Sequence, residues 1–129
     1  MVEKREEQKI VEISYHQFDG LMHNLVRKVN RFIDSRKTKF TGFYGIPRGG
    51  LPIAVHLSHH CNLPLLNEPK RNCIIVEDII DSGSSTCVYY KKYPIVSLFY
   101  KKGAKTKPTI GIREIRDKDW IVFSWELRK

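Results

Sequence analysis

The sequence has little of what marks secreted, disulfide-linked or membrane proteins. Among its 129 residues there are only 3 cysteines, widely spaced at positions 61, 73 and 87. An odd number of separated cysteines favours free thiols in a reducing compartment over a disulfide framework. No apolar run approaches the roughly 18 residues of a membrane span, and the charged start MVEKREEQKI lacks the apolar core of a secretory signal. We therefore expect a cytoplasmic protein without a membrane span.

Acidic charge is also scarce. Asp and Glu number 14 against 23 Lys and Arg, which gives a formal net charge of +9 at pH 7. This excess predicts an anionic partner such as nucleic acid, a phosphorylated metabolite or a membrane surface. The length and the 41% hydrophobic content fit one globular domain. We expect residues 1–10, which are polar and aperiodic, to form a flexible tail, and residues 11–129 to form a single domain.

The apolar residues alternate between helical and strand patterns. Ser14 to Gln17 has the Ser-x-x-Gln form of a capping box, and it precedes an amphipathic pattern of about five helical turns. Further helices are predicted over residues 51–60 and 86–92. Strands are predicted over residues 39–46, 73–76, 95–100, 109–112 and 120–125. This alternation predicts an α/β fold with a mainly parallel central sheet flanked by helices.

Two turns follow predicted strands, at residues 47–50 and 77–85. In parallel sheets, ligands bind at the carboxyl ends of the strands. The second turn lies in CIIVEDIIDSGSST, residues 73–86, in which an apolar strand leads into two adjacent carboxylates, a third carboxylate and a Ser-Gly turn. Gly83 permits a positive φ, so that backbone N–H groups and hydroxyls converge as a phosphate cradle. Carboxylates suit sugar hydroxyls and hydrated Mg²⁺. The segment therefore predicts a ribose phosphate site, whereas a Ser-Gly turn alone would more often be a plain helix start.

The string CIIVEDIIDSGSST resembles the phosphoribosyl pyrophosphate motif of type I phosphoribosyltransferases, and most closely that of the bacterial xanthine-guanine enzymes. Three other stretches follow in the order of that family. Ile46 to Leu51 (IPRGGL) resembles its pyrophosphate loop, Ser97 to Lys101 (SLFYK) its base-reading strand, and Asp119 to Ile121 (DWI) the segment that covers the purine. The resemblance extends from about residue 13 to residue 126. It implies a Mg²⁺-dependent purine-salvage transferase that joins phosphoribosyl pyrophosphate to guanine, xanthine or hypoxanthine.

The resemblance also implies roles for individual residues. Glu77 and Asp78 would face the ribose, with Asp78 contributing to the Mg²⁺ site, and Asp81 would exchange a proton with the purine. The 5′-phosphate would be held by Ser82, Gly83, Ser84 and Ser85. The pyrophosphate would be held by Arg48 and the Gly49 backbone, in a loop that often contains a cis peptide in this family. The base would be read by Lys101 at O6, Trp120 by stacking and the Ile121 backbone.

One interval departs from the family pattern. Active members carry a long mobile loop that closes over the site, but here only Pro64 to Asn72 separates the second helix from the acidic motif. A segment this short cannot form such a lid, so we expect weak catalysis or a lid from another subunit or from the N-terminal tail. The family's usual assembly implies a homo-oligomer, either a dimer or a tetramer.

Two alternative functions stay open at this point. One is a non-catalytic or weakly catalytic nucleotide-sensing or RNA-binding regulator on the same fold, which the net charge and the short interval would suit. The other is a transferase for another base. A basic group at residues 27–39 is most often a solvated helix face but would also suit nucleic-acid phosphates. His56 and His60 have metal-ligand spacing, although structural histidines are the commoner interpretation.

Overall fold

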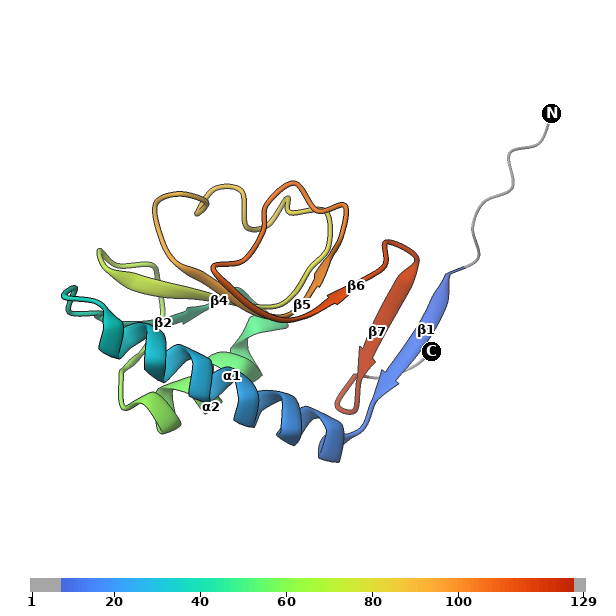
Figure 1. The fold of residues 1–129 in the computed structure, drawn as a ribbon, viewed down its shortest axis with the longest axis horizontal. Coiled ribbons are helices and arrows are strands. Elements are labelled where there is room, and N and C mark those ends of the chain that lie inside the picture. Colours follow the sequence, from blue (N-terminus) through green and yellow to red (C-terminus); the bar gives the residue numbers. More distant parts are fainter. Residues whose placement is uncertain (1–7, 127–129) are drawn as a thin grey trace.

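A five-stranded parallel sheet forms the centre of the protein. The computed structural model describes residues 8–126, and its large sheet has the strand order β3-β2-β4-β5-β6 (Figure 1). All neighbouring pairs in this sheet are parallel. Its strands are β2 (Gly42–Gly45), β3 (Leu65–Leu66), β4 (Cys73–Ile80), β5 (Ile95–Lys101) and β6 (Ile110–Ile115). The predicted α/β class is confirmed.

Two helices cover one face of this sheet. Helix α1 (Tyr15–Ser35) begins at the predicted capping box, in which the Ser14 hydroxyl accepts the Gln17 N–H and the Gln17 side chain accepts the Ser14 N–H. Helix α2 is Gly50–Cys61, and both helices lie below the sheet in Figure 1. Leu25 and Val29 of α1 and Leu57 of α2 are fully buried in the main core. Within residues 8–126 neither helix is long and apolar enough to cross a membrane.

Loops cover the opposite face, where the sequence predicted a short helix over residues 86–92 that the structure does not contain. Residues 86–92 form successive turns, in which Cys87 and Tyr90 bond four residues back and Tyr89 bonds three residues back. A segment this short, with β-branched and aromatic residues and Pro94 behind it, has little intrinsic tendency to form a regular helix. Instead, the rings of Tyr89 and Tyr93 pack on a second core cluster that includes Ile75 and Ile95.

A separate two-stranded sheet joins the ends of the domain. Strand β1 (Lys9–Ile13) pairs in parallel with β7 (Asp119–Phe123), with Ile13 opposite Phe123. The predicted flexible tail is therefore too long by at least two residues, because Lys9 and Ile10 belong to β1. The remainder of that tail, residues 1–7, lies outside the described residues. The pairing holds β7 beside the carboxyl edge of the main sheet (Figure 1).

The end of strand β4 differs from the sequence prediction in a way that shapes the site. Strand β4 continues four residues beyond Val76, and Glu77 and Ile79 pair with Ser97 and Phe99 of β5. The acidic pair therefore lies inside a strand rather than in a loop. Strand β2 is shorter than the predicted 39–46.

The three cysteines are free thiols. The described residues contain no cluster of His, Cys, Asp and Glu that would hold a metal, and this includes His56 and His60.

Candidate functional site

The two predicted ligand-binding turns meet at the carboxyl edge of the sheet. A Cβ atom on Gly49 would overlap the Asp78 carboxylate, and one on Gly50 would overlap the Val76 carbonyl. The Ile46 N–H donates to that same Val76 carbonyl at 2.9 Å. Glycine is needed here because the turn before α2 rests directly on the end of β4.

The turn before α2 has the cis peptide that the family resemblance implies, between Pro47 and Arg48. The Gly50 N–H donates to the Ile46 carbonyl at 2.9 Å, and the Leu51 N–H to the Arg48 carbonyl at 3.1 Å, which closes the turn onto the helix. The Arg48 side chain is exposed and lines neither of the two cavities described next.

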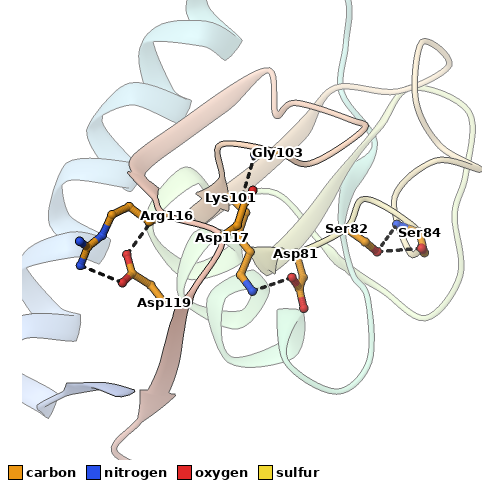
Figure 2. A network of polar contacts seen from close by, with 8 residues as sticks. All are labelled: Asp81, Ser82, Ser84, Lys101, Gly103, Arg116, Asp117 and Asp119. Atoms are coloured by element: carbon orange, nitrogen blue, oxygen red, sulfur yellow. Dashed lines mark hydrogen bonds and ion pairs between the residues drawn. The ribbon is translucent and has the colours of Figure 1, made fainter. Parts of the chain in front are cut away.

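The larger of the two cavities at this edge has a volume of about 230 Å³. In Figure 2 the Lys101 side chain from the end of β5 points toward Asp81, and its ammonium lies 2.8 Å from a carboxylate oxygen. The same ammonium lies 5.9 Å from the ring centre of Trp120, which is 46% exposed. An aromatic face beside a fixed ammonium suits a planar heterocycle that carries an acceptor oxygen. The polar and aromatic lining comprises Asp78, Asp81, Lys101, Asp119, Trp120 and Glu126.

A smaller cavity of about 50 Å³ lies in the Ser-Gly turn. Its lining runs from Ile79 to Thr86 and includes Glu77. The Ser82 hydroxyl lies 2.7 Å from the Ser84 hydroxyl and accepts the Ser84 N–H at 3.2 Å (Figure 2). Gly83 has the expected positive φ, at 92°. Ile79 and Asp81 line both cavities, so the hydroxyl-rich turn and the aromatic cavity are neighbours.

The Ser-Gly turn is supported by the loop after β5, which the sequence prediction missed. The Lys105 N–H donates to the Ser82 carbonyl at 2.9 Å. The buried hydroxyls of Thr86 and Thr106 lie 2.6 Å apart. No regular helix follows the turn. The contact between Thr86 and Thr106 therefore stabilises the turn in place of the predicted helix. The only signal in the sequence is that both loops follow adjacent strands.

The two members of the acidic pair, Glu77 and Asp78, differ in burial. Glu77 is 8% exposed, and its burial, together with the neighbouring Asp78 carboxylate, raises the pKa of Glu77 to about 9. Glu77 is therefore neutral at pH 7 and can both donate and accept a hydrogen bond. Its oxygen accepts the Asp78 N–H at 3.1 Å, and the Asp78 carboxylate accepts the Ile79 N–H at 2.8 Å.

A pair of hydrogen bonds that the sequence prediction also missed holds Asp119, the residue before Trp120, at the start of β7. The buried Asp119 carboxylate accepts the Arg116 N–H at 2.9 Å and the Arg116 guanidinium at 3.3 Å (Figure 2). The backbone N–H of Arg116 is the main cause that holds the pKa of Asp119 below its usual range, with the guanidinium adding to it. Behind this turn, a Glu126 oxygen accepts the Phe123 N–H at 2.9 Å.

The short interval at residues 64–72 contributes no lining residue to either cavity. Leu65 and Leu66 form the edge strand and pair with Phe43 and Tyr44. This segment extends the sheet on the side away from β5 instead of covering the site, in agreement with its expected inability to form a lid.

The donor set at this edge fits a magnesium ion that binds together with a phosphorylated substrate. The described residues provide no all-protein metal cage. Asp78 and Asp81, however, line the same cavity next to the hydroxyl-rich turn. Mg²⁺ is commonly held by one or two carboxylates, substrate phosphates and waters. Two carboxylates at a phosphate-sized turn are what such binding requires.

Solved structures with a similar fold include purine phosphoribosyltransferases. The purine phosphoribosyltransferase of Pyrococcus horikoshii aligns with a TM-score of 0.77 and 24% identity, over 93% of this chain and 96% of that chain. The xanthine-guanine-hypoxanthine phosphoribosyltransferase of Helicobacter pylori aligns with a TM-score of 0.74 and 23% identity, over 92% and 93%. The hypoxanthine-guanine phosphoribosyltransferase of Schistosoma mansoni, in complex with IMP, aligns with a TM-score of 0.66 and 20% identity, over 87% and 69%.

A scan against protein-family models finds no match for this sequence, and a search of curated proteins finds none either. The structural neighbours therefore establish the fold. The expectation of a phosphoribosyltransferase-like fold, drawn from the motif at residues 73–86, is confirmed.

Proposed function

We propose that this protein is a purine phosphoribosyltransferase that moves the 5-phosphoribosyl group from phosphoribosyl pyrophosphate to a 6-oxopurine and releases pyrophosphate. The observation that carries the proposal is the pair of neighbouring cavities that share Ile79 and Asp81. One cavity has an aromatic ring and an ammonium, and the other has converging hydroxyls and N–H groups. A ribose phosphate that spans the two would bring its C1 carbon close to Asp81.

Base selection rests on Lys101. Its side chain is only 12% exposed, so the ammonium is largely withdrawn from water and its hydrogen bonds carry more weight. It donates to the O6 oxygen of guanine, xanthine or hypoxanthine, whereas the amino group of adenine presents a donor in the same place. Trp120 stacks on the purine ring, and the Ile121 backbone contacts the group at C2.

The chemistry places one proton on Asp81. The bond between the ribose C1 and the pyrophosphate oxygen breaks, a bond forms between C1 and a ring nitrogen of the base, and the proton lost by the base passes to Asp81. Glu77, which is neutral, and Asp78 bind the ribose hydroxyls. Arg48 and the Gly49 N–H stabilise the charge on the departing pyrophosphate. Held by Asp78 and the substrate, Mg²⁺ would neutralise part of that negative charge.

The short interval at residues 64–72 does not by itself exclude an enzyme. The alignments cover more than nine-tenths of both this chain and the two purine phosphoribosyltransferases from Pyrococcus and Helicobacter, so the interval is not part of a large deletion relative to them. We propose that another subunit of a homo-oligomer, or the N-terminal residues, screens the site from water during the reaction.

The deciding experiment supplies phosphoribosyl pyrophosphate, Mg²⁺ and a panel of guanine, xanthine, hypoxanthine, adenine and uracil, and identifies the nucleotide product by mass spectrometry. We expect the 6-oxopurine nucleotides with release of pyrophosphate. Asp81→Asn should lower kcat by about 100-fold or more while thermal unfolding stays unchanged, because Asp81 is 58% exposed. Full activity of Asp81→Asn would show that Asp81 is not the proton acceptor.

The second candidate is a nucleotide-sensing regulator on the same fold. Its supporting observation is that residues 64–72, where a lid would arise, are used to build the edge of the sheet. Tight binding of a purine mononucleotide, with no nucleotide formed from any base of the panel, would favour this regulator over the transferase.

A further inference from the structure

The opposite edge of the sheet carries a second candidate binding surface. Three loops meet where the strands begin, on the left of Figure 1: residues 36–41, 70–72 and 91–94. The Thr41 N–H donates to the Asn72 carbonyl at 2.9 Å, and the Thr41 hydroxyl donates to the Arg71 carbonyl at 3.0 Å. The Ile75 N–H donates to the Pro94 carbonyl at 2.9 Å. These bonds hold the three loops together as one surface.

The charge of this surface is entirely positive. No Asp or Glu occurs in the three loops, and the carboxylates that flank them in sequence, Asp34 and Glu68, do not line the groove between them. Seven cationic side chains, all exposed, lie in these loops: Arg36, Lys37, Lys39, Lys70, Arg71, Lys91 and Lys92. A cluster of this size costs stability through mutual repulsion, which a bound polyanion would relieve.

A groove of about 340 Å³ runs between these loops. Arg36, Lys91 and Lys92 line it together with three half-buried aromatic rings, those of Phe32, Phe40 and Tyr93. The Phe32 and Phe40 rings are 5.6 Å apart and inclined by 34°. The Arg36 guanidinium lies 4.7 Å above the Phe32 ring. The groove thus offers flat apolar surfaces next to cations.

We propose that this groove binds single-stranded nucleic acid, with phosphates on Arg36, Lys91 and Lys92 and a base against the aromatic rings. The cations come from separate loops and spread along the edge, which suits a row of phosphates better than one small anion. Single strands present bases that stack on aromatic side chains, whereas a duplex hides them. An acidic peptide would match the charges but would leave the rings without a planar partner.

The groove is separate from the proposed transferase site. Strands β4 and β5 run from this edge to the other, and the eight residues of β4 span roughly 25 Å at the usual rise of a strand. The proposal therefore stands whether or not the other edge transfers phosphoribosyl groups.

The test measures fluorescence anisotropy of a labelled oligouridylate of about 12 nucleotides, a length typical of single-strand sites. The main variant is Lys91→Gly with Lys92→Ala. Glycine is chosen because Lys91 has a φ of 69°, which glycine accepts without strain. Arg36→Gln is a second variant in a different loop. The control, Arg27→Ala with Lys28→Ala, removes two exposed charges from α1 outside the groove.

We expect the main variant to weaken binding at least tenfold and the control to change it less than twofold. The slope of log affinity against log salt should become shallower by about 1.4 in the main variant, the value for two lost phosphate contacts on a single strand. Binding of GMP, which would occupy the other edge, should be unchanged in the main variant, and this also verifies its fold.

Four results would overturn the proposal. They are equal losses in the main variant and the control, tighter binding of a duplex of the same length, displacement of the oligonucleotide by GMP, and equally good displacement by polyglutamate. Equal losses would assign the binding to net charge alone, and the last result would assign the groove to an acidic protein partner. If no transferase activity is found, the oligonucleotide result is expected to be the same.

Discussion

The Lys101 ammonium lies 2.8 Å from the Asp81 carboxylate, and the two side chains differ in exposure, at 12% and 58%. The cation is thus held in place while the carboxylate remains open to the cavity. Since each partner neutralises the other, the cavity offers an incoming base a donor and an acceptor side by side. Residues 20 positions apart in sequence meet in this way because β4 and β5 are adjacent parallel strands with the same polarity.

Replacing Lys101 should weaken the binding of 6-oxopurine nucleotides much more than the binding of AMP. In Lys101→Met the donor to O6 is lost, so affinity for GMP and IMP should fall by about tenfold or more, the usual effect of losing a charged hydrogen bond. Affinity for AMP should change much less, because AMP has no oxygen at this position. Isothermal titration with the three nucleotides measures the difference. Lys102→Met, at the exposed neighbouring position, is the matched control, and equal losses for GMP and AMP would contradict the assignment.

A methyl group at Gly49 should disrupt the site through overlap with Asp78 and not through an unfavourable φ. Gly49 has a φ of −61°, which alanine adopts freely, but the new Cβ would overlap the Asp78 carboxylate. Gly49→Ala should therefore displace either the turn or Asp78 and weaken nucleotide binding at least tenfold.

The matched control for this substitution is Gly20→Ala. Gly20 lies in α1, where an added Cβ meets nothing within 4 Å, so alanine should raise the free energy of unfolding by about 0.5–1 kcal/mol. Urea unfolding and nucleotide titration of both variants check this pair. Unchanged binding in Gly49→Ala would show that the contact with Asp78 is not needed.

The sequence predicted those parts of the fold and site that depend on local patterns. The capping box at Ser14, the positive φ at Gly83 and the meeting of the two turns follow from residues close in sequence or from strand polarity. The pairing of β1 with β7 and the contact of Thr86 with Thr106 join residues that are distant in sequence. The pattern of apolar residues along the chain does not predict such contacts. The predicted helix at residues 86–92 was wrong because tertiary packing of Tyr89 and Tyr93 outweighs weak local propensity there.

Removing the carboxyl group of Glu77 should abolish a pH dependence of stability. The folded protein raises the pKa of Glu77 to about 9 from a reference value of 4.5, so the folded state keeps a proton that the unfolded chain loses. This contribution to stability is complete below pH 4.5 and declines as the pH rises toward 9. Relative to the wild type, Glu77→Gln should gain stability progressively over that interval.

Urea unfolding at several pH values between about 4.5 and 9 follows this change. Glu114→Gln removes an exposed carboxyl group from strand β6, which lies two strands away from β4 in the same sheet, and serves as the control. The burial argument would be refuted if the advantage of Glu77→Gln over the wild type stayed constant across the interval, or if Glu114→Gln showed the same trend.

The hydroxyl contact between Thr86 and Thr106 should couple the two loops that form the smaller cavity. Both side chains are buried, and their oxygens are 2.6 Å apart. Thr106→Val leaves the Thr86 hydroxyl with only the Gly83 carbonyl at 3.3 Å, so the variant should lose about 1–2 kcal/mol of stability. Adding Thr86→Val should cost little more stability, because no buried hydroxyl is then left without its partner.

The single variant Thr106→Val should also bind GMP more weakly than the wild type does. It should bind guanosine equally well, since only GMP has a phosphate to place in the turn that Thr106 supports. Equal losses for nucleotide and nucleoside would mean that the contact stabilises the fold without shaping the phosphate site.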